Sequence, residues 1–136
     1  MLEEVFDARR TVAELEGIDR SLGLDDRLVA AVEVLQARMR RMFALFHSMR
    51  LRPPAEKDPA AHRARQEADT ALLNDAVVDL IGADVHRLRC HPLHAATVLR
   101  TMTFSLTHPM LGDAELASPR CVVDLVLHGV LRSTPC

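Results

Sequence analysis

The spacing of apolar residues between Leu28 and Met49 constrains the fold of this chain more than any other feature. These residues follow one another at alternating intervals of four and three: Leu28, Val32, Leu35, Met39, Met42, Phe46 and Met49. The spacing places all of them on one face of an α-helix. Three heptads also suit a coiled coil, but the flanking positions lack the complementary charges that coiled coils use. The pattern therefore favours a long helix buried in a helical bundle.

Capping residues define the first two predicted helices. A capping box at Thr11–Glu14 predicts a short helix that ends at Gly17. The long helix is expected to begin with Asp25 or Asp26 as its N-cap and to run to about Met49.

Prolines and a glycine define the later helices. A capping residue followed by proline predicts three helix starts, at Asp58-Pro59, His91-Pro92 and Ser118-Pro119. Gly82 and His108-Pro109 mark two helix ends. No stretch shows the alternation of a β-strand. The expected fold is all-α, a bundle of about five to six helices.

Charge and aromatic content argue against a nucleic-acid surface. There are 17 Lys and Arg against 19 Asp and Glu, for a net charge of −2, and aromatic residues make up 3% with no Trp or Tyr. Nucleic-acid-binding domains usually carry a basic excess, and single-strand binders use aromatic stacking. No apolar run approaches the ~20 residues that a membrane span needs. We therefore expect no membrane partner.

The three cysteines, Cys90, Cys121 and Cys136, are odd in number and widely spaced. The N-terminus is acidic, with Glu3 and Glu4, unlike a secretory signal. Reduced thiols and a cytoplasmic location are the expected outcome.

A cluster of potential metal ligands surrounds Pro92. His86 and Cys90 are four residues apart, as are Cys90 and His94, with His91 between them. On one continuous helix such ligands would converge, but Pro92 disfavours helical geometry at His91. We therefore expect no metal, no cofactor and no catalytic residue. The alternative is a small helical metal-binding protein or enzyme that uses Cys90, His91 and His94.

From Asp26 onward the chain resembles the C-terminal domain of TetR-type transcriptional regulators. The resemblance covers about four-fifths of the chain. It rests on these segments: Asp26-Arg27-Leu28-Val29-Ala30-Ala31-Val32, Leu88-Arg89-Cys90-His91-Pro92, His108-Pro109, Val123-Asp124-Leu125 and Leu127-His128-Gly129. It implies an effector-binding and dimerisation domain over residues 25–136. Residues 1–24 would be the remnant of the helix that connects it to an N-terminal helix-turn-helix domain. DNA would be bound only through that domain, which is missing here.

The resemblance also implies two sets of site residues. The last two helices would form a four-helix bundle with a second copy, through Leu99, Thr103, Leu106, Val122, Leu125, Val126 and Gly129. A small hydrophobic effector would contact Met39, Met42, Phe43, Phe46, Met49, Leu73, Val77 and Met102.

Two features of the residues themselves bear on these sites. The bulky methionine and phenylalanine side chains face alanines at Ala61, Ala64 and Ala68, and such a mismatch can leave a cavity. The same stripe is equally compatible with an ordinary core, which would make the protein a purely structural helical dimer. Gly129 either ends the last helix or, as we expect, allows close approach of a second helix. A glycine within a helix costs about 1 kcal/mol.

Overall fold

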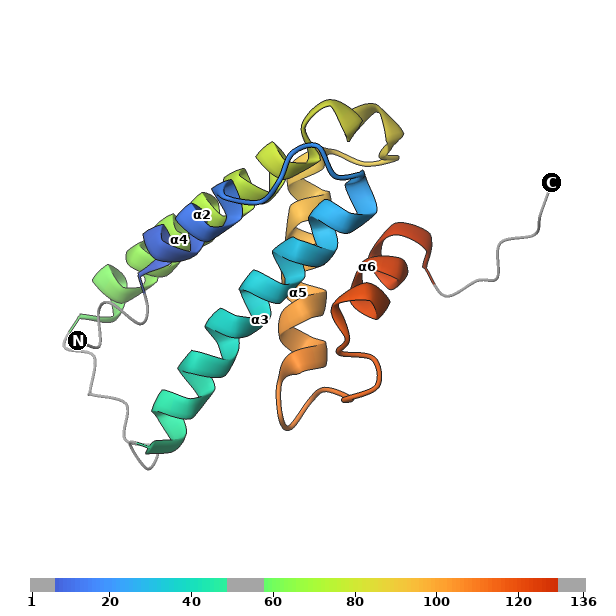
Figure 1. Cartoon of the computed structure of the whole chain (residues 1–136). Coiled ribbons are helices and arrows are strands. Elements are labelled where there is room, and N and C mark those ends of the chain that lie inside the picture. Colours follow the sequence, from blue (N-terminus) through green and yellow to red (C-terminus); the bar gives the residue numbers. More distant parts are fainter. Residues whose placement is uncertain (1–6, 49–57, 130–136) are drawn as a thin grey trace.

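The computed structural model describes residues 7–48 and 58–129, and within these ranges the chain is all-helical without strands (Figure 1). The elements are α2 (Ala8–Glu16), α3 (Leu24–Ser48), α4 (Pro59–Ile81), the 3-10 helix η1 (Gly82–Arg87), α5 (Pro92–Thr107) and α6 (Pro119–His128). The expected all-α bundle is confirmed.

Side-chain caps begin three of these helices where the sequence predicted them. Asp58, His91 and Ser118 each accept a hydrogen bond from a backbone N–H of the first helical turn, and a proline follows each of them. The proline loses nothing at this position, because the first N–H groups of a helix have no partner within the helix. The predicted ends at Gly82 and before His108 are also confirmed.

The predicted capping box at Thr11–Glu14 is wrong. Helix α2 begins at Ala8, and its N-cap is Asp7, whose carboxylate accepts from the backbone N–H of Arg9 at 2.9 Å. Thr11 therefore lies inside the helix, where it is buried. The predicted end of this helix at Gly17 is confirmed. Helix α3 begins at Leu24, so the two aspartates expected to cap it lie in its first turn.

Helix α3 is the central element and contacts all the other α-helices (Figure 1). Helix α2 lies along α4, and α5 and α6 pack against each other and against α3. Ala8 and Leu15 of α2 belong to the main core, so the described part of residues 1–24 is an integral part of the bundle. The other buried residues of this core are Leu24, Leu28, Ala31, Val32, Leu73, Ala76, Val77, Leu80, Ile81, Ala96, Leu99, Val122 and Val123.

Burial changes along the two longest helices. On α3 the apolar face is buried from Leu28 to Met39, but Phe46 is 37% exposed. On α4 the buried residues begin only at Leu73, after the alanine-rich first half of the helix. We call residues 24–32, 73–81 and η1 the closed end of the bundle. The open end comprises residues 40–48, 59–72 and the segment 104–118.

Candidate functional site

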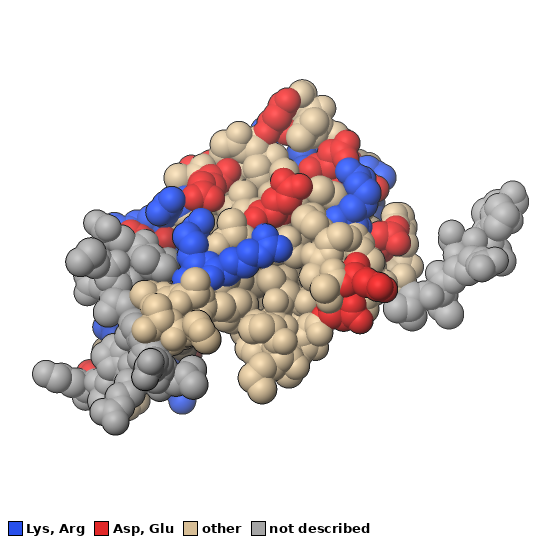
Figure 2. Space-filling model, turned by 60° about the horizontal axis from the view of Figure 1, so that its bottom comes forward, with Lys and Arg blue, Asp and Glu red and all other residues tan. Residues whose placement is uncertain are grey.

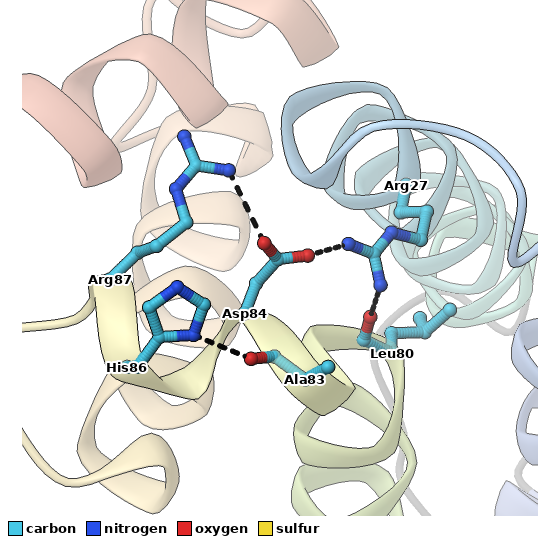
Figure 3. Close-up of polar contacts among 6 residues, drawn as sticks. All are labelled: Arg27, Leu80, Ala83, Asp84, His86 and Arg87. Carbon is cyan, nitrogen blue, oxygen red and sulfur yellow. Dashed lines mark hydrogen bonds and ion pairs between the residues drawn. The ribbon is translucent and has the colours of Figure 1, made fainter.

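A buried arginine forms the polar centre of the closed end (Figure 3). Arg27 is 8% exposed, and its Nη1 donates to the backbone carbonyl of Leu80 at 2.7 Å. Its Nη2 donates to the carboxylate of Asp84 in η1. A side chain of α3 thus satisfies a carbonyl in the last turn of α4, which would otherwise lack a helical partner.

Asp84 joins two arginines across this junction. Its other carboxylate oxygen accepts from Arg87 Nη1 at 3.4 Å, and His86 Nδ1 lies 2.7 Å from the carbonyl of Ala83 (Figure 3). The hydrogen bond from Arg27 lowers the pKa of the Asp84 carboxyl below its ordinary value. Because the two charges are paired with each other and join α3 to the end of α4 and to η1, we assign this group of side chains a structural role.

A second buried polar side chain lies nearer the open end. Gln36 is 1% exposed, and its Nε2 donates to Thr107 Oγ1 at 3.1 Å and to the backbone carbonyl of Ala117. It joins α3 to the end of α5 and to the segment that leads into α6. Neither Arg27 nor Gln36 was predicted as a site residue, although each is a polar residue next to a position of the apolar seam, Leu28 or Leu35.

A hollow of about 390 Å³ lies between the C-terminal end of α5 and the start of α6. We call it the α5–α6 hollow. It is lined by Arg40, Leu106, Thr107, His108, Pro109, Gly112, Asp113, Ala114, Ala117, Ser118 and Pro119. The two acceptors of Gln36, Thr107 and Ala117, belong to this lining. The buried glutamine therefore fixes part of its wall.

A second hollow, of about 440 Å³, runs along α4. All of its lining residues come from that one helix: Arg63, Gln66, Glu67, Thr70, Ala71 and Asn74. A surface formed by one helix does not enclose a ligand, so we do not consider it as a site.

Aromatic side chains join α3 to α5 at the open end. The ring of Phe43 lies 6.1 Å from that of Phe104 and 5.1 Å from that of His108, measured between centroids. Phe104 and His108 are 5.6 Å apart. These separations are typical of favourable ring contacts. The cluster orients His108, which also lines the α5–α6 hollow.

Among the residues that the structure describes, those predicted for a hydrophobic effector differ widely in burial. Leu73 and Val77 belong to the main core, and Met39 is also buried. Met42, Phe43 and Met102 are partly buried, Phe46 is exposed, and Met49 lies outside the described residues. None of the seven described residues lines either hollow.

Three residues predicted for the dimer interface are buried within the single chain. Leu99, Thr103 and Val122 are at most 1% exposed, so they leave no surface for a second copy. Apolar residues lie on both sides of α5. Leu99 and Thr103 belong to its inner arc, the side that packs against the rest of the bundle. Its outer arc instead exposes Leu93, Val98 and Phe104. Of the remaining predicted residues, Leu106, Leu125 and Val126 are partly buried.

Gly129 ends α6 rather than lying within it. Its φ is 72°, which favours glycine, and its N–H bonds to the carbonyl of Leu125. A Cβ added there would meet no atom within 4 Å in the described structure. No described helix therefore approaches Gly129 closely.

The segment around Pro92 does not gather metal ligands. The Nδ1 of His91 accepts from the N–H of Leu93 at 3.1 Å and so serves as the cap of α5. Its ring is 5.9 Å from that of His94, and the Nδ1 of His86 bonds to a backbone carbonyl. Across residues 7–48 and 58–129, no group of three or more His, Cys, Asp or Glu side chains is arranged to hold a metal ion.

Basic and acidic side chains are interspersed on the face shown in Figure 2, and no continuous basic stripe crosses it. None of the described helices combines the length and apolar character needed to cross a membrane. No family model, no curated protein and no solved structure matches this chain. The likeness to TetR-type regulators therefore rests on the sequence segments quoted above and on an all-helical fold.

Proposed function

We propose that this chain is the ligand-sensing and dimerisation region of a TetR-like transcriptional regulator, with a repressor as the expected type. The uncharged outer arc of α5 is the observation that carries the proposal. This arc lies opposite Ala96, Leu99 and Thr103, and it exposes Leu93 by 42%, Val98 by 45% and Phe104 by 42%.

Two threonines make this arc more apolar than its sequence suggests. Thr97 Oγ1 donates to the carbonyl of Leu93 at 2.9 Å, and Thr101 Oγ1 donates to the carbonyl of Thr97 at 2.7 Å. Because both hydroxyl protons are used within the helix, these residues can only accept further hydrogen bonds, as Thr97 Oγ1 does from Asn74 Nδ2 at 3.4 Å. Exposed apolar surface that lacks charge is typical of interaction sites.

A second copy of the chain is the partner that fits this arc. In a two-fold dimer each residue near the axis meets its own counterpart, so a charged arc would bring like charges together. The outer arc contains no Asp, Glu, Lys or Arg. On the neighbouring helix α6, Leu125 and Val126 are only partly buried. They could contact a second copy, as the predicted four-helix bundle requires.

Light scattering tests the dimer with two matched substitutions. The parent chain and Leu72→Glu should be dimers at tens of micromolar, whereas Val98→Glu should be a monomer. Leu72 on α4 is 43% exposed, so the two substitutions add the same charge at sites of similar exposure. A monomeric parent, or a Val98→Glu variant that remains dimeric, would contradict the proposed interface.

The proposed effector is small and hydrophobic, and the partly covered apolar residues at the end of α3 support it. Met42 and Phe43 are partly buried and Phe46 is exposed, so this segment is not locked into the main core. Methionine side chains adapt to varied ligands. In a thermal-shift screen of hydrophobic compounds, Phe46→Ala should change the shifts while the dimer persists. Identical shifts in both proteins would remove Phe46 from the effector site.

DNA would be recognised through a helix-turn-helix domain and not through residues 25–136. With a net charge of −2, the chain offers little for the counterion release that drives even non-specific DNA binding. In fluorescence anisotropy with promoter fragments, we expect no binding at physiological salt. Tight sequence-dependent binding would contradict the proposal.

A further inference from the structure

We propose that the α5–α6 hollow binds a small organic carboxylate with a compact apolar body, and that Arg40 binds its carboxylate group. This site is separate from the hydrophobic residues predicted for the effector, and it does not depend on the family resemblance. The inference comes from the hydrogen-bonding groups that line the hollow and from the partners they lack.

Arg40 provides the charge. It is exposed and lines the hollow, and its guanidinium has no hydrogen bond or ion pair within residues 7–48 and 58–129. Arg27 and Arg120, by comparison, are paired with Asp84 and Asp26. A planar guanidinium with free donors is suited to forming paired hydrogen bonds with a carboxylate.

Two hydroxyl groups in the lining have protons to donate. Thr107 Oγ1 accepts from Gln36 Nε2 at 3.1 Å, and Ser118 Oγ accepts from the N–H of Cys121 at 3.3 Å. In each case the oxygen is used as an acceptor, and its own proton has no acceptor among the described residues. A hydroxyl group can donate and accept at the same time, so both remain able to donate to a ligand.

His108 adds a third donor of this kind. Its Nδ1 accepts from the N–H of Met110 at 3.1 Å, so in the neutral ring the proton is on Nε2. Contacts with Phe43 and Phe104 hold the ring in place. With Arg40, Thr107 and Ser118, the hollow thus offers several donors and calls for a ligand rich in acceptors.

Asp113 is the acidic residue of the lining, and its carboxylate is partly used by the loop. Its Oδ1 accepts from the N–H of Glu115 at 2.8 Å and from the N–H of Leu116 at 3.4 Å. The remaining negative charge opposes a bound anion. Replacing it with asparagine keeps the acceptor for the loop and removes the repulsion, which gives a substitution that should strengthen binding.

The rest of the lining limits the size and character of the ligand. Its apolar part consists of Leu106, Pro109, Ala114, Ala117 and Pro119. The volume of about 390 Å³ is near the lower end of the ~300–1,000 Å³ range of small-molecule sites. Because Gln36 bonds to both Thr107 and Ala117, this wall is anchored to the core. These features favour a compact apolar body attached to the acid.

Calorimetric titration of the intact chain with benzoate tests the proposal, with benzamide as the neutral analogue and with acetate and inorganic phosphate as small anions. We expect benzoate to bind in the millimolar range or tighter and the other three to bind more weakly. Arg40→Gln should weaken benzoate about tenfold or more, as expected for the loss of a charge-assisted hydrogen bond. Asp113→Asn should strengthen it by about threefold.

Arg89→Gln is the matched control, because it removes one exposed arginine near the opposite end of α5, a helix about 24 Å long. Benzoate affinity should be unchanged in this variant. The proposal is overturned if the parent does not bind benzoate, if Arg40→Gln binds it equally well, or if benzamide binds as tightly. Equal binding of phosphate or acetate would also overturn it, because the apolar body would then contribute nothing. Circular dichroism should show the same fold in all variants.

Discussion

The two ends of this bundle use their polar side chains in opposite ways. At the closed end Arg27 is buried, and it is paired with the carbonyl of Leu80 and with Asp84. At the open end Arg40 belongs to the same helix but is exposed and has no partner in the described chain. The same residue type therefore stabilises the fold at one end and remains available to a ligand at the other.

Apolar residues show the same contrast. The members of the main core on α3 lie between Leu24 and Val32, and those on α4 lie between Leu73 and Ile81. Farther along α3, Phe46 is exposed, and on α5 Phe104 is 42% exposed. Stability should thus be concentrated at the closed end, and binding should be sought at the open end. Substitutions at the closed end should therefore change mainly the free energy of unfolding, and substitutions at the open end should change mainly ligand binding.

The largest expected effect is on the core of the closed end. Leu80 is fully buried, so Leu80→Ala should lower the free energy of unfolding by about 3–4 kcal/mol through lost burial and the cavity left behind. Leu72, on the same helix but 43% exposed, should lose about 1 kcal/mol or less in the same substitution. Urea denaturation of both variants measures the difference. Equal losses would show that the core does not end where the structure places it.

The sequence predicted the helices better than it predicted their faces. Asp58, His91 and Ser118 were found because a cap followed by proline is a local signal that depends on few neighbours. The capping box at Thr11–Glu14 failed because Asp7, a few residues earlier, provides the cap. A local motif does not reveal whether a residue one turn earlier caps the helix instead.

The candidate sites were harder to predict, because they depend on contacts distant in sequence. Gln36 bonds to residues 71 and 81 positions away, and Arg27 bonds to Asp84 across 57 positions. No spacing rule connects such pairs. Leu99 and Thr103 were predicted for the dimer interface because α5 carries apolar residues on more than one face. Only its neighbours determine which side is buried.

The second prediction concerns the buried arginine of the closed end. Arg27→Ala should lower the free energy of unfolding by about 2–4 kcal/mol, since it leaves the carbonyl of Leu80 without its partner and removes the packing of the side-chain stem. Arg40→Ala should change it by about 0.5 kcal/mol or less, because Arg40 is exposed. If the two variants unfold alike, the contrast between the ends is wrong.

The third substitution tests how the buried Gln36 supports the open end. Gln36→Ala should cost about 1–3 kcal/mol, because it leaves the partly buried carbonyl of Ala117 without this donor. It should also weaken benzoate in the α5–α6 hollow, since Thr107 and Ala117 lose the side chain that positions them. Thermal unfolding and the same titration measure both effects. A loss of stability without any change in benzoate affinity would separate Gln36 from the hollow.

The smallest effect should appear in acid and should belong to the closed end. Because the hydrogen bond from Arg27 lowers the pKa of Asp84 in the folded protein, folding is favoured while this carboxyl is ionised. That contribution is complete above the ordinary Asp pKa of about 3.9 and is lost as the pH falls through the lower folded-state value. Asp7 and Asp19 also have lowered pKa values, through Arg9 and Ser21, so the parent should lose stability from several carboxyls at once.

The substitution Asp84→Asn isolates the contribution of the Asp84 carboxyl from those of Asp7 and Asp19. The difference in unfolding free energy between the parent and this variant should be constant from neutral pH to just above the ordinary carboxyl pKa and should shrink in more acidic buffers. Asp113→Asn is the counterpart at the open end, where the carboxylate accepts only backbone N–H groups among the described residues and has no arginine bound to it. Its unfolding free energy should follow that of the parent closely at neutral pH, since asparagine retains the acceptor. A pH-independent difference for Asp84→Asn would mean that its charge does not stabilise the junction of α3, α4 and η1. Arg27 would then act there through the carbonyl of Leu80 alone.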